Sequence, residues 1–254
     1  MSRAELPAYY TRLAEFRSLF STGTPILTYH KLGPRPPRVR RKGLYLSTFL
    51  FDRQLGELRR AGFASGSLDA LPGAVVSARP SVVVTFDDGC ASVLDHGLEP
   101  LERFGFRAIQ FLVAGLLGGT NAWDAERGEV EERLMDQAQV RTWVAAGHSI
   151  GAHSMTHPDL TRISPVRARE EIVASKKRLE DLFAVSIDHF CYPFGSWNSQ
   201  VAEMVLEAGY RTACTTEFGV NTADTPSLAL RRITARYRSR SLRSFLRTVL
   251  GARA

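Results

Sequence analysis

The sequence has little cysteine and no long hydrophobic run. Its three cysteines, Cys90, Cys191 and Cys214, are odd in number and scattered along the chain. This argues against a disulfide framework or a cysteine-based metal site and favours a reducing compartment. No apolar stretch approaches the length of a membrane span, and residues 1–20 carry charges without the apolar core of a secretory signal. We therefore expect a cytoplasmic protein.

Acidic residues are outnumbered, and the positive excess is unevenly placed. The net charge is +7, and residues 231–254 hold eight arginines and no acidic residue. A second basic cluster consists of Arg35, Arg38, Arg40, Arg41 and Lys42. Such clusters can attract a membrane surface, nucleic acid or an anionic glycan, but a solvated arginine-rich surface is the commoner explanation. We favour that explanation and expect no nucleic-acid partner.

The chain also lacks internal repeats, and its 254 residues suit one large α/β domain. Strand patterns alternate with helix patterns, which indicates βα units and a parallel sheet. Strands are predicted at residues 25–29, 81–86, 107–113, 149–153, 187–192, 211–215 and 228–235, with a weaker one at 63–68. Helices are predicted at residues 47–61, 91–104, 140–146, 165–183, 199–208 and 242–250.

Four predicted helices are each followed by a glycine that suits a left-handed C-terminal residue, namely Gly62, Gly105, Gly147 and Gly209. These repeated helix–glycine–strand junctions favour a (β/α) barrel, although the pattern also allows a doubly wound sheet. We expect residues 1–23 to form an N-terminal helical extension. Residues 24–254 would then form a single barrel domain that ends in an arginine-rich helix.

The most informative segment is residues 81–89, where a valine-rich run ends in Asp87, Asp88 and Gly89. The run indicates a buried strand, and α/β proteins place their chemistry where such strands end. Neighbouring side chains at a strand end point in different directions. One carboxylate can therefore bind a metal while the other faces a substrate. The alternative is a pair of exposed acids that cap the following helix.

A second segment, residues 153–157, contains His153 and His157. Two histidines at this spacing converge on one metal ion if they share a helical turn or a tight loop. Asp plus two His is a ligand set suited to a catalytic divalent ion with open coordination positions. The alternative is a pair of histidines in a polar loop before Pro158.

Together these segments resemble the polysaccharide deacetylase family, the family-four carbohydrate esterases. Thr85-Phe86-Asp87-Asp88-Gly89 matches the first motif of that family, and His153-Ser154-Met155-Thr156-His157 matches its second, His-Ser/Thr-x-x-His. The resemblance covers roughly residues 24–235, about one domain by length. It implies a single-domain, distorted (β/α)7 TIM-like barrel with seven parallel strands.

The resemblance also implies roles for these residues. Asp88, His153 and His157 would hold one divalent metal ion, for which Zn²⁺ suits the ligand set best, although cobalt or another divalent ion would fit. Asp87 would be the general base that takes a proton from the attacking water. Ser154 lies between the histidines and could orient a ligand.

Residues 190–195 resemble the third family motif, a turn that forms one wall of the substrate groove. The resemblance implies that Tyr192 and Pro193 contact the substrate and that the backbone amide of Phe194 donates to the oxyanion. Trp197 would add an aromatic surface for a sugar. The Tyr-Pro-Phe-Gly form resembles the branch that includes poly-N-acetylglucosamine deacetylases. The segment could also be a plain turn after a strand.

The chain departs from the family pattern in three places. Cys191 stands where many members have an arginine that steadies the catalytic aspartate. The aspartate-tryptophan fourth motif is not evident in residues 214–221, and residues 228–233 lack the histidine that serves as general acid. His30, at the end of the first predicted strand, is the candidate replacement, because the barrel would bring it to the same rim as Asp87. A structural, hydrogen-bonded histidine is the alternative for His30.

The other histidines outside the motifs, His96, His148 and His189, are expected at the surface or in turns. The pattern as a whole predicts a metal-dependent hydrolase that removes N-acetyl groups from amino sugars of a glycan or glycan precursor. A barrel amidase acting on a non-sugar C–N amide bond is one alternative. A catalytically silent homologue that binds metal or glycan is another, favoured by the missing arginine and histidine. The sequence does not indicate an oligomeric state.

The arginine-rich C-terminal segment has apolar residues at helical spacing: Leu242, Phe245, Leu246, Val249 and Leu250. We expect a last helix that packs this face on the barrel. The alternative is an interfacial helix that rests on anionic lipid, which would place the protein at the periphery of the inner membrane.

Overall fold

In the computed structural model, residues 6–7, 9–71 and 80–236 are described. The predicted helix at residues 242–250, and with it the prediction of membrane contact, lies outside the described residues. Within the described ranges, no helix is long and apolar enough to cross a membrane.

Seven parallel strands close into a barrel, which confirms the predicted (β/α)7 fold. They are β1 (Ile26–Tyr29), β5 (Ser81–Phe86), β6 (Ala108–Leu112), β7 (Ser149–Ala152), β8 (His189–Cys191), β9 (Thr212–Phe218) and β10 (Leu230–Thr234). The ring closes because β1 pairs with both β10 and β5. The weaker predicted strand is only β4 (Ala64–Ser65), which pairs with the start of β5. A two-residue pairing of β2 (Lys31–Leu32) with β3 (Tyr45–Leu46) was not predicted.

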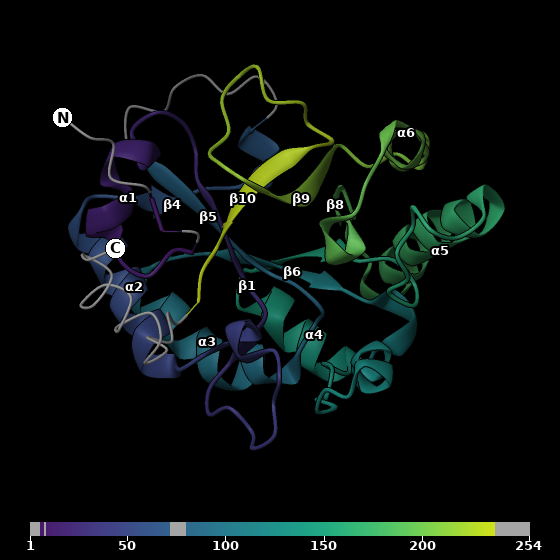
Figure 1. The fold of residues 1–254 in the computed structure, drawn as a ribbon, viewed down its shortest axis with the longest axis horizontal. Coiled ribbons are helices and arrows are strands. Elements are labelled where there is room, and N and C mark those ends of the chain that lie inside the picture. Colours follow the sequence, from purple (N-terminus) through teal and green to yellow (C-terminus); the bar gives the residue numbers. More distant parts are fainter. Residues whose placement is uncertain (1–5, 8, 72–79, 237–254) are drawn as a thin grey trace, which may run out of the picture.

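Six α-helices surround the strands in the described residues (Figure 1). They are α1 (Leu13–Phe20), α2 (Thr48–Arg60), α3 (Ala91–Phe104), α4 (Gln137–Ala145), α5 (Pro165–Phe183) and α6 (Ser199–Glu207). Short 3₁₀ turns include η1 (Lys42–Leu44), η2 (Leu68–Ala70), η3 (Ala114–Leu116), η4 (Ala122–Arg127) and η5 (Pro193–Gly195). Gly62, Gly105, Gly147 and Gly209 all have positive φ, as predicted.

Helix α4 begins three residues earlier than the apolar pattern predicted, at Gln137. Asp136 and Gln139 form a reciprocal capping box, in which each side chain accepts a hydrogen bond from the backbone N–H of the other. This box satisfies two of the otherwise unpaired N–H groups of the first turn, so the helix can start ahead of its first buried residue, Val140.

The strands separate two apolar regions. Alternating residues such as Ile109 and Phe111 fill the inside of the barrel, together with Cys191 and Cys214. A much larger cluster lies between the strands and the helices. The N-terminal segment joins this outer core, because Phe16 and Phe20 of α1 pack with Phe63 and the other aromatic rings beside it.

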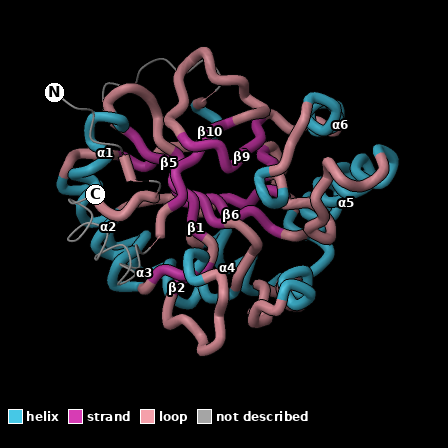
Figure 2. Tube along the Cα trace, viewed as in Figure 1, coloured by secondary structure: helices cyan, strands magenta, loops and turns pink. Residues whose placement is uncertain are grey.

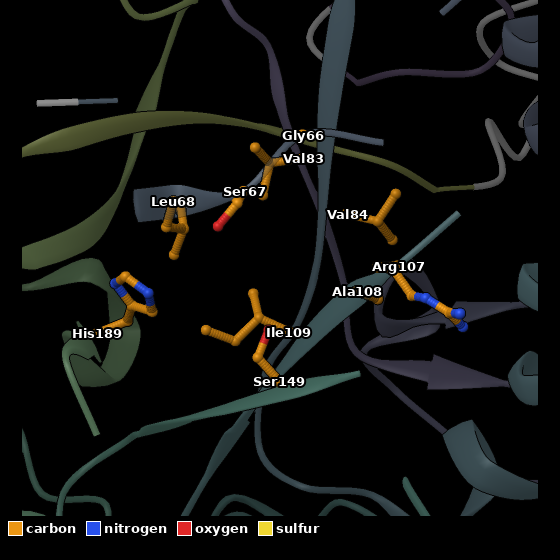
Figure 3. Close-up of a pocket in the computed structure, with 10 residues that line it drawn as sticks. All are labelled: Gly66, Ser67, Leu68, Val83, Val84, Arg107, Ala108, Ile109, Ser149 and His189. Atoms are coloured by element: carbon orange, nitrogen blue, oxygen red, sulfur yellow. The ribbon is translucent and has the colours of Figure 1, made fainter. Parts of the chain in front are cut away.

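At the end of the barrel where the strands begin, a cavity of about 160 Å³ opens between η2 and the first residues of β5, β6, β7 and β8 (Figure 3). His189 lines it and is buried, which corrects its expected place at the surface. Its Nδ1 lies 2.9 Å from the Thr212 hydroxyl, and its Nε2 lies 3.3 Å from a carboxylate oxygen of Asp69. Each ring nitrogen of His189 therefore has a partner within the protein, which indicates a structural role for this histidine.

His148 is also buried rather than exposed. Its Nδ1 accepts a hydrogen bond from the backbone N–H of Ala108 (3.2 Å), and its ring stacks on Trp143 with centroids 4.2 Å apart. Burial lowers the pKa of His148 from 6.5 to about 4, and the charge of Arg107 adds to this effect. The neutral ring is the form that fits, because a protonated imidazole has no acceptor.

We expect His148 to weaken the fold in acid. Between pH 6.5 and about 4 the unfolded chain binds a proton here that the folded protein excludes, so stability present above pH 6.5 is lost as the pH falls. The effect is on the order of 1–2 kcal/mol, because solvent screens part of the charge. Urea unfolding of wild type and His148→Asn across this interval measures it, because asparagine keeps an acceptor but does not titrate. Equal pH dependence in the two proteins would contradict the assignment.

Candidate active site

Strand β5 delivers Asp87 and Asp88 to the rim where the barrel strands end. Both carboxylates are buried, with 3% and 5% of each residue exposed. Asp88 has a φ of 74° and Gly89 a φ of 79°, so the chain turns sharply through the left-handed region. A non-glycine residue held there carries strain of about 1–3 kcal/mol. This turn sends the two carboxylates in different directions.

The Asp88 carboxylate faces the two motif histidines. Its Oδ1 lies 3.6 Å from His153 Nε2 and 3.5 Å from His157 Nε2. Two ligand atoms that are each about 2.1 Å from a tetrahedral ion stand about 3.4 Å apart. The donor set therefore fits one divalent cation in both chemistry and spacing, and the three atoms lie within 4.8 Å of one another.

Backbone contacts fix both histidines in this arrangement. His153 Nδ1 lies 2.6 Å from the carbonyl oxygen of Cys191, which can only accept, so Nδ1 carries the proton and Nε2 is left as an acceptor. The hydroxyl of Ser154 accepts a hydrogen bond from the backbone N–H of His157 (3.0 Å). Ser154 thus closes the turn that brings the second histidine back toward the first.

Glu171 of α5 holds the same turn from outside. Its carboxylate accepts hydrogen bonds from the backbone N–H groups of Met155 and Thr156 (2.9 and 2.8 Å) and from the Thr156 hydroxyl (2.5 Å). Only 6% of Glu171 is exposed. Sequence reasoning missed this residue, because a glutamate within a charged helix resembles many solvent-exposed ones.

Aromatic rings pack against His157. The ring of Trp123 in η4 stacks on it with centroids 4.3 Å apart, and the ring of Phe194 meets it edge-on at 4.6 Å. His157 Nδ1 is buried, and within the described residues no hydrogen-bond partner reaches it. Ring packing therefore positions the His157 imidazole, whereas a hydrogen bond positions that of His153.

The other carboxylate, Asp87, is held by Arg232 of β10. The guanidinium donates two hydrogen bonds to the two carboxylate oxygens, each 2.8 Å long. Arg232 is only 2% exposed and also donates to the Thr215 carbonyl (2.7 Å). Burial acts to raise the pKa of Asp87, but the charge and hydrogen bonds of Arg232 outweigh it and hold that pKa below its usual value.

Arg232 also takes the place of the arginine that is missing at position 191. One of its nitrogens lies 3.2 Å from Cys191 Sγ, so its guanidinium occupies the space beside that residue. Position 191 does lack the arginine, as the sequence showed, but Asp87 still has a guanidinium partner because Arg232 comes from a different strand.

A second group of possible ligands, Asp87, His153 and Cys191, also converges. Two observations argue against a cation there. Arg232 already neutralises Asp87 and touches Cys191, so an ion would meet a positive charge. Burial also raises the pKa of the Cys191 thiol well above its usual value, whereas a metal ligand must be the thiolate. The Asp88 set is the better cation site.

His30 ends at the same rim, as the sequence predicted from barrel geometry. Its Nε2 lies 3.8 Å from Oδ2 of Asp87, and its side chain is 20% exposed. The imidazole therefore sits beside the Asp87–Arg232 pair with access to solvent. The 3.8 Å separation is longer than a hydrogen bond, so the two groups are close neighbours that are not directly bonded.

The residues predicted to form the wall of the substrate groove differ in how far their side chains are accessible. Tyr192 is fully buried, and its hydroxyl donates to the Leu228 carbonyl (3.0 Å), so its side chain is committed to the interior. Pro193 is buried as well. Trp197 is half-buried, stacks on Tyr192 with centroids 6.2 Å apart, and donates to a carboxylate oxygen of Glu217 (3.0 Å). Trp123, like Phe194, contacts the ring of His157 directly and so lies beside the candidate cation site.

Comparison with known proteins identifies the family to which this barrel belongs. The family model for polysaccharide deacetylases matches residues 75–213, more than half of the chain. The chain belongs to this family. The match includes both motifs but ends before Arg232 and begins after His30.

Two curated relatives illustrate the similarity. The putative polysaccharide deacetylase YxkH of Bacillus subtilis is 27% identical over 152 residues, which cover 60% of this chain and 50% of that protein. The chitooligosaccharide deacetylase of a Bradyrhizobium strain is 29% identical over 139 residues, covering 53% of this chain and 55% of that one. The chain thus spans about half the length of the curated relatives it matches.

Solved structures share the whole barrel. The Streptococcus pyogenes deacetylase PplD, solved in complex with acetate, has a TM-score of 0.73 and 25% identity and covers 84% of this chain and 92% of its own. IcaB from Ammonifex degensii has a TM-score of 0.71 and 22% identity, covering 91% and 97%. The shared fold therefore extends well beyond the residues that the family model matches.

We expect Arg232→Met to destabilise the protein by about 3–5 kcal/mol, because it leaves the Asp87 carboxylate buried and unpaired. Adding Asp87→Asn removes that charge, so the double variant should be more stable than Arg232→Met alone. Urea unfolding of both single variants and the double variant at one pH measures the coupling. Simple additivity of the two changes would contradict a direct buried ion pair.

Proposed function

We propose that this protein is a metal-dependent N-deacetylase acting on N-acetylated amino sugars of a glycan or glycan precursor. The observation that carries the proposal is the convergence of Asp88, His153 and His157 beside a second carboxylate, Asp87, that faces a separate direction. The family match supports the reaction class and the glycan. The chitooligosaccharide deacetylase among the relatives supports an N-acetylated sugar.

Asp88, His153 and His157 would hold the divalent ion, and zinc fits their oxygen and nitrogen donors best. Bound there, such an ion would polarise the amide carbonyl and lower the pKa of a water molecule. The protein prepares the site before an ion arrives. The hydrogen bond from His153 to Cys191 sets the tautomer, and the Trp123 stack sets the His157 ring plane.

Asp87 would act as the general base. Its lowered pKa keeps it ionised, so it can accept a proton from the attacking water. Arg232 occupies one side of both oxygens, which leaves the remaining lone pairs of the carboxylate to face the rim. The ion pair therefore orients the base as well as keeping it charged.

His30 would act as the general acid. Its Nε2 stands 3.8 Å from Asp87 Oδ2 and it is partly open to solvent, so it can protonate the leaving amine and be recharged by water. The backbone amide of Phe194 would donate to the oxyanion, as the family motif implies. Trp197 and Trp123, with the turn at Tyr192 and Pro193, would bound the sugar.

A silent metal- or glycan-binding homologue is a weaker second candidate. It was favoured by the absence of an arginine at position 191 and of a late histidine. Arg232 and His30 supply the same two chemical groups beside Asp87, which removes the motive for that candidate.

We expect one Zn²⁺ to bind per chain and to raise the melting temperature. Asp88→Ala should weaken zinc binding by at least about a hundredfold, since even changes behind the ligands cost ten- to hundredfold. Titration calorimetry with zinc alone measures this without any activity assay. The control is Asp224→Ala, an exposed loop aspartate. Unchanged zinc affinity in Asp88→Ala would contradict the ligand set.

We expect Asp87→Asn to keep zinc binding but to lower acetate release from chitooligosaccharides by roughly a hundredfold or more, the usual scale for a lost general base. Asparagine is similar in size but cannot accept the proton. Acetate is measured with a coupled enzyme assay, and Asp224→Asn is the control. Acetate release at the wild-type rate by Asp87→Asn would disprove the role of the base, and its absence from wild type would disprove the activity.

A further inference from the structure

The loop that joins β2 to β3 carries the densest positive charge in the described residues. We call residues 33–44 the basic loop. All five of its cationic side chains are exposed: Arg35, Arg38, Arg40, Arg41 and Lys42. The loop projects from the barrel beyond β2 (Figure 2). It follows His30 by only the two residues of β2, so it emerges from the rim that carries Asp87 and Asp88.

The basic loop is fastened to η4. The carboxylate of Glu129 accepts hydrogen bonds from the backbone N–H groups of Arg40 and Arg41 (3.1 and 2.8 Å). The Arg41 guanidinium lies 3.7 Å from Asp124, whose carboxylate is almost fully buried. A buried carboxylate that lost this partner would be left uncompensated, so the contact fixes the loop in place.

This attachment links the loop to the reaction centre. Asp124 is the neighbour of Trp123, and Trp123 stacks on His157 at 4.3 Å. A group bound by the loop would therefore be held at a fixed place relative to the cation site. Pro34, Pro36 and Pro37 restrict the backbone further, which reduces the entropy lost when a ligand is bound.

The remaining four cations have no such structural task. Within the described parts of the chain, the side chains of Arg35, Arg38, Arg40 and Lys42 form no ion pair with an acidic group. Like charges this close repel one another, and exposed positive charges that are not neutralised attract anions. Arginine in particular matches the paired oxygens of phosphate and carboxylate groups.

We propose that the basic loop binds an anionic group carried by the substrate, so that the preferred substrate is a glycan bearing phosphate or carboxylate near its N-acetylated sugar. This inference rests on the proposed deacetylase function and names its substrate class. The coupling to Trp123 favours a substrate over a lipid surface. The apolar residues within the loop, Val39 and Leu44, are buried or half-buried, so the loop offers no exposed large apolar side chain to insert into a bilayer.

The test compares two probes that differ only in one charged group. They are fully N-acetylated chitotetraose and its 1-phosphate. Acetate release from each gives kcat/KM for wild type at low and high salt. The loop variant is Arg35→Gln, Arg38→Asn, Arg40→Gln and Lys42→Gln, which leaves Arg41 and its contact with Asp124 intact. Asparagine is used at position 38 because Arg38 has a φ of 68°. The matched control is Arg59→Gln with Arg60→Gln, two exposed arginines at the far end of α2.

We expect wild type and the control to prefer the phosphorylated probe by about tenfold or more at low salt, and this preference to shrink at high salt. In the loop variant the ratio of the two kcat/KM values should fall toward one. Equal kcat/KM values in wild type would overturn the inference while leaving the deacetylase function standing. A preference that survives in the loop variant would overturn it as well.

Two further measurements separate the remaining outcomes. If no probe releases acetate, the proposed function fails, and calorimetric binding of the two probes then tests the inference separately. Tighter binding of the phosphorylated probe that is lost in the loop variant would support the inference. Equal binding of the two probes would overturn it. Co-sedimentation with phosphatidylglycerol vesicles tests the lipid alternative. Loop-dependent pelleting with an unchanged substrate ratio would show that the loop binds membranes instead.

Discussion

The buried ion pair between Arg232 and Asp87 is the interaction on which the site depends. Removing two charges from water costs several kcal/mol for each ion, and the pair is tolerated only if further hydrogen bonds satisfy it. Arg232 meets that condition with its bonds to Thr215 and to both Asp87 oxygens. These bonds require β10 to face the inside of a closed ring. Barrel closure and the orientation of the Asp87 carboxylate are therefore one constraint.

The residues of the site come from two kinds of sequence segment, those inside the family match and those outside it. The motifs that bear Asp88, His153 and His157 lie within the segment matched by the family. His30 and Arg232, which flank Asp87, come from β1 and β10, outside the match. They reach Asp87 because β1 lies between β10 and β5 in the ring. A sequence motif can thus identify the candidate cation site, while the surroundings of Asp87 follow only from the closed topology.

Local patterns predicted the strands and helices and favoured a barrel, and the family resemblance reduced the remaining choice to a seven-stranded barrel with converging motifs. A valine run indicates a buried strand, and a glycine after a helix marks its end, wherever the rest of the chain lies. Arg232 could not be predicted in the same way. In Leu-Arg-Arg-Ile-Thr, which arginine faces inward depends on the register of β10, and that register is irregular between Leu230 and Arg232. Glu171 was missed because a glutamate in a charged helix resembles solvent-exposed ones, and the burial of His148 was missed because its hydrogen-bond partner, the N–H of Ala108, lies 40 residues earlier in the chain.

Backbone strain connects the fold to the proposed chemistry. Six non-glycine residues in the described chain have positive φ, and four belong to the site motifs: Asp88, Ser154, His157 and Phe194. Each costs energy that surrounding contacts must offset. Glu171 and Ser154 do so for the histidine turn, by satisfying its backbone N–H groups. The result is a set of donor atoms that already stand at the spacing of a tetrahedral site, so binding an ion would require little rearrangement. The strained backbone at these four residues thus helps to place the donor atoms where an ion would need them.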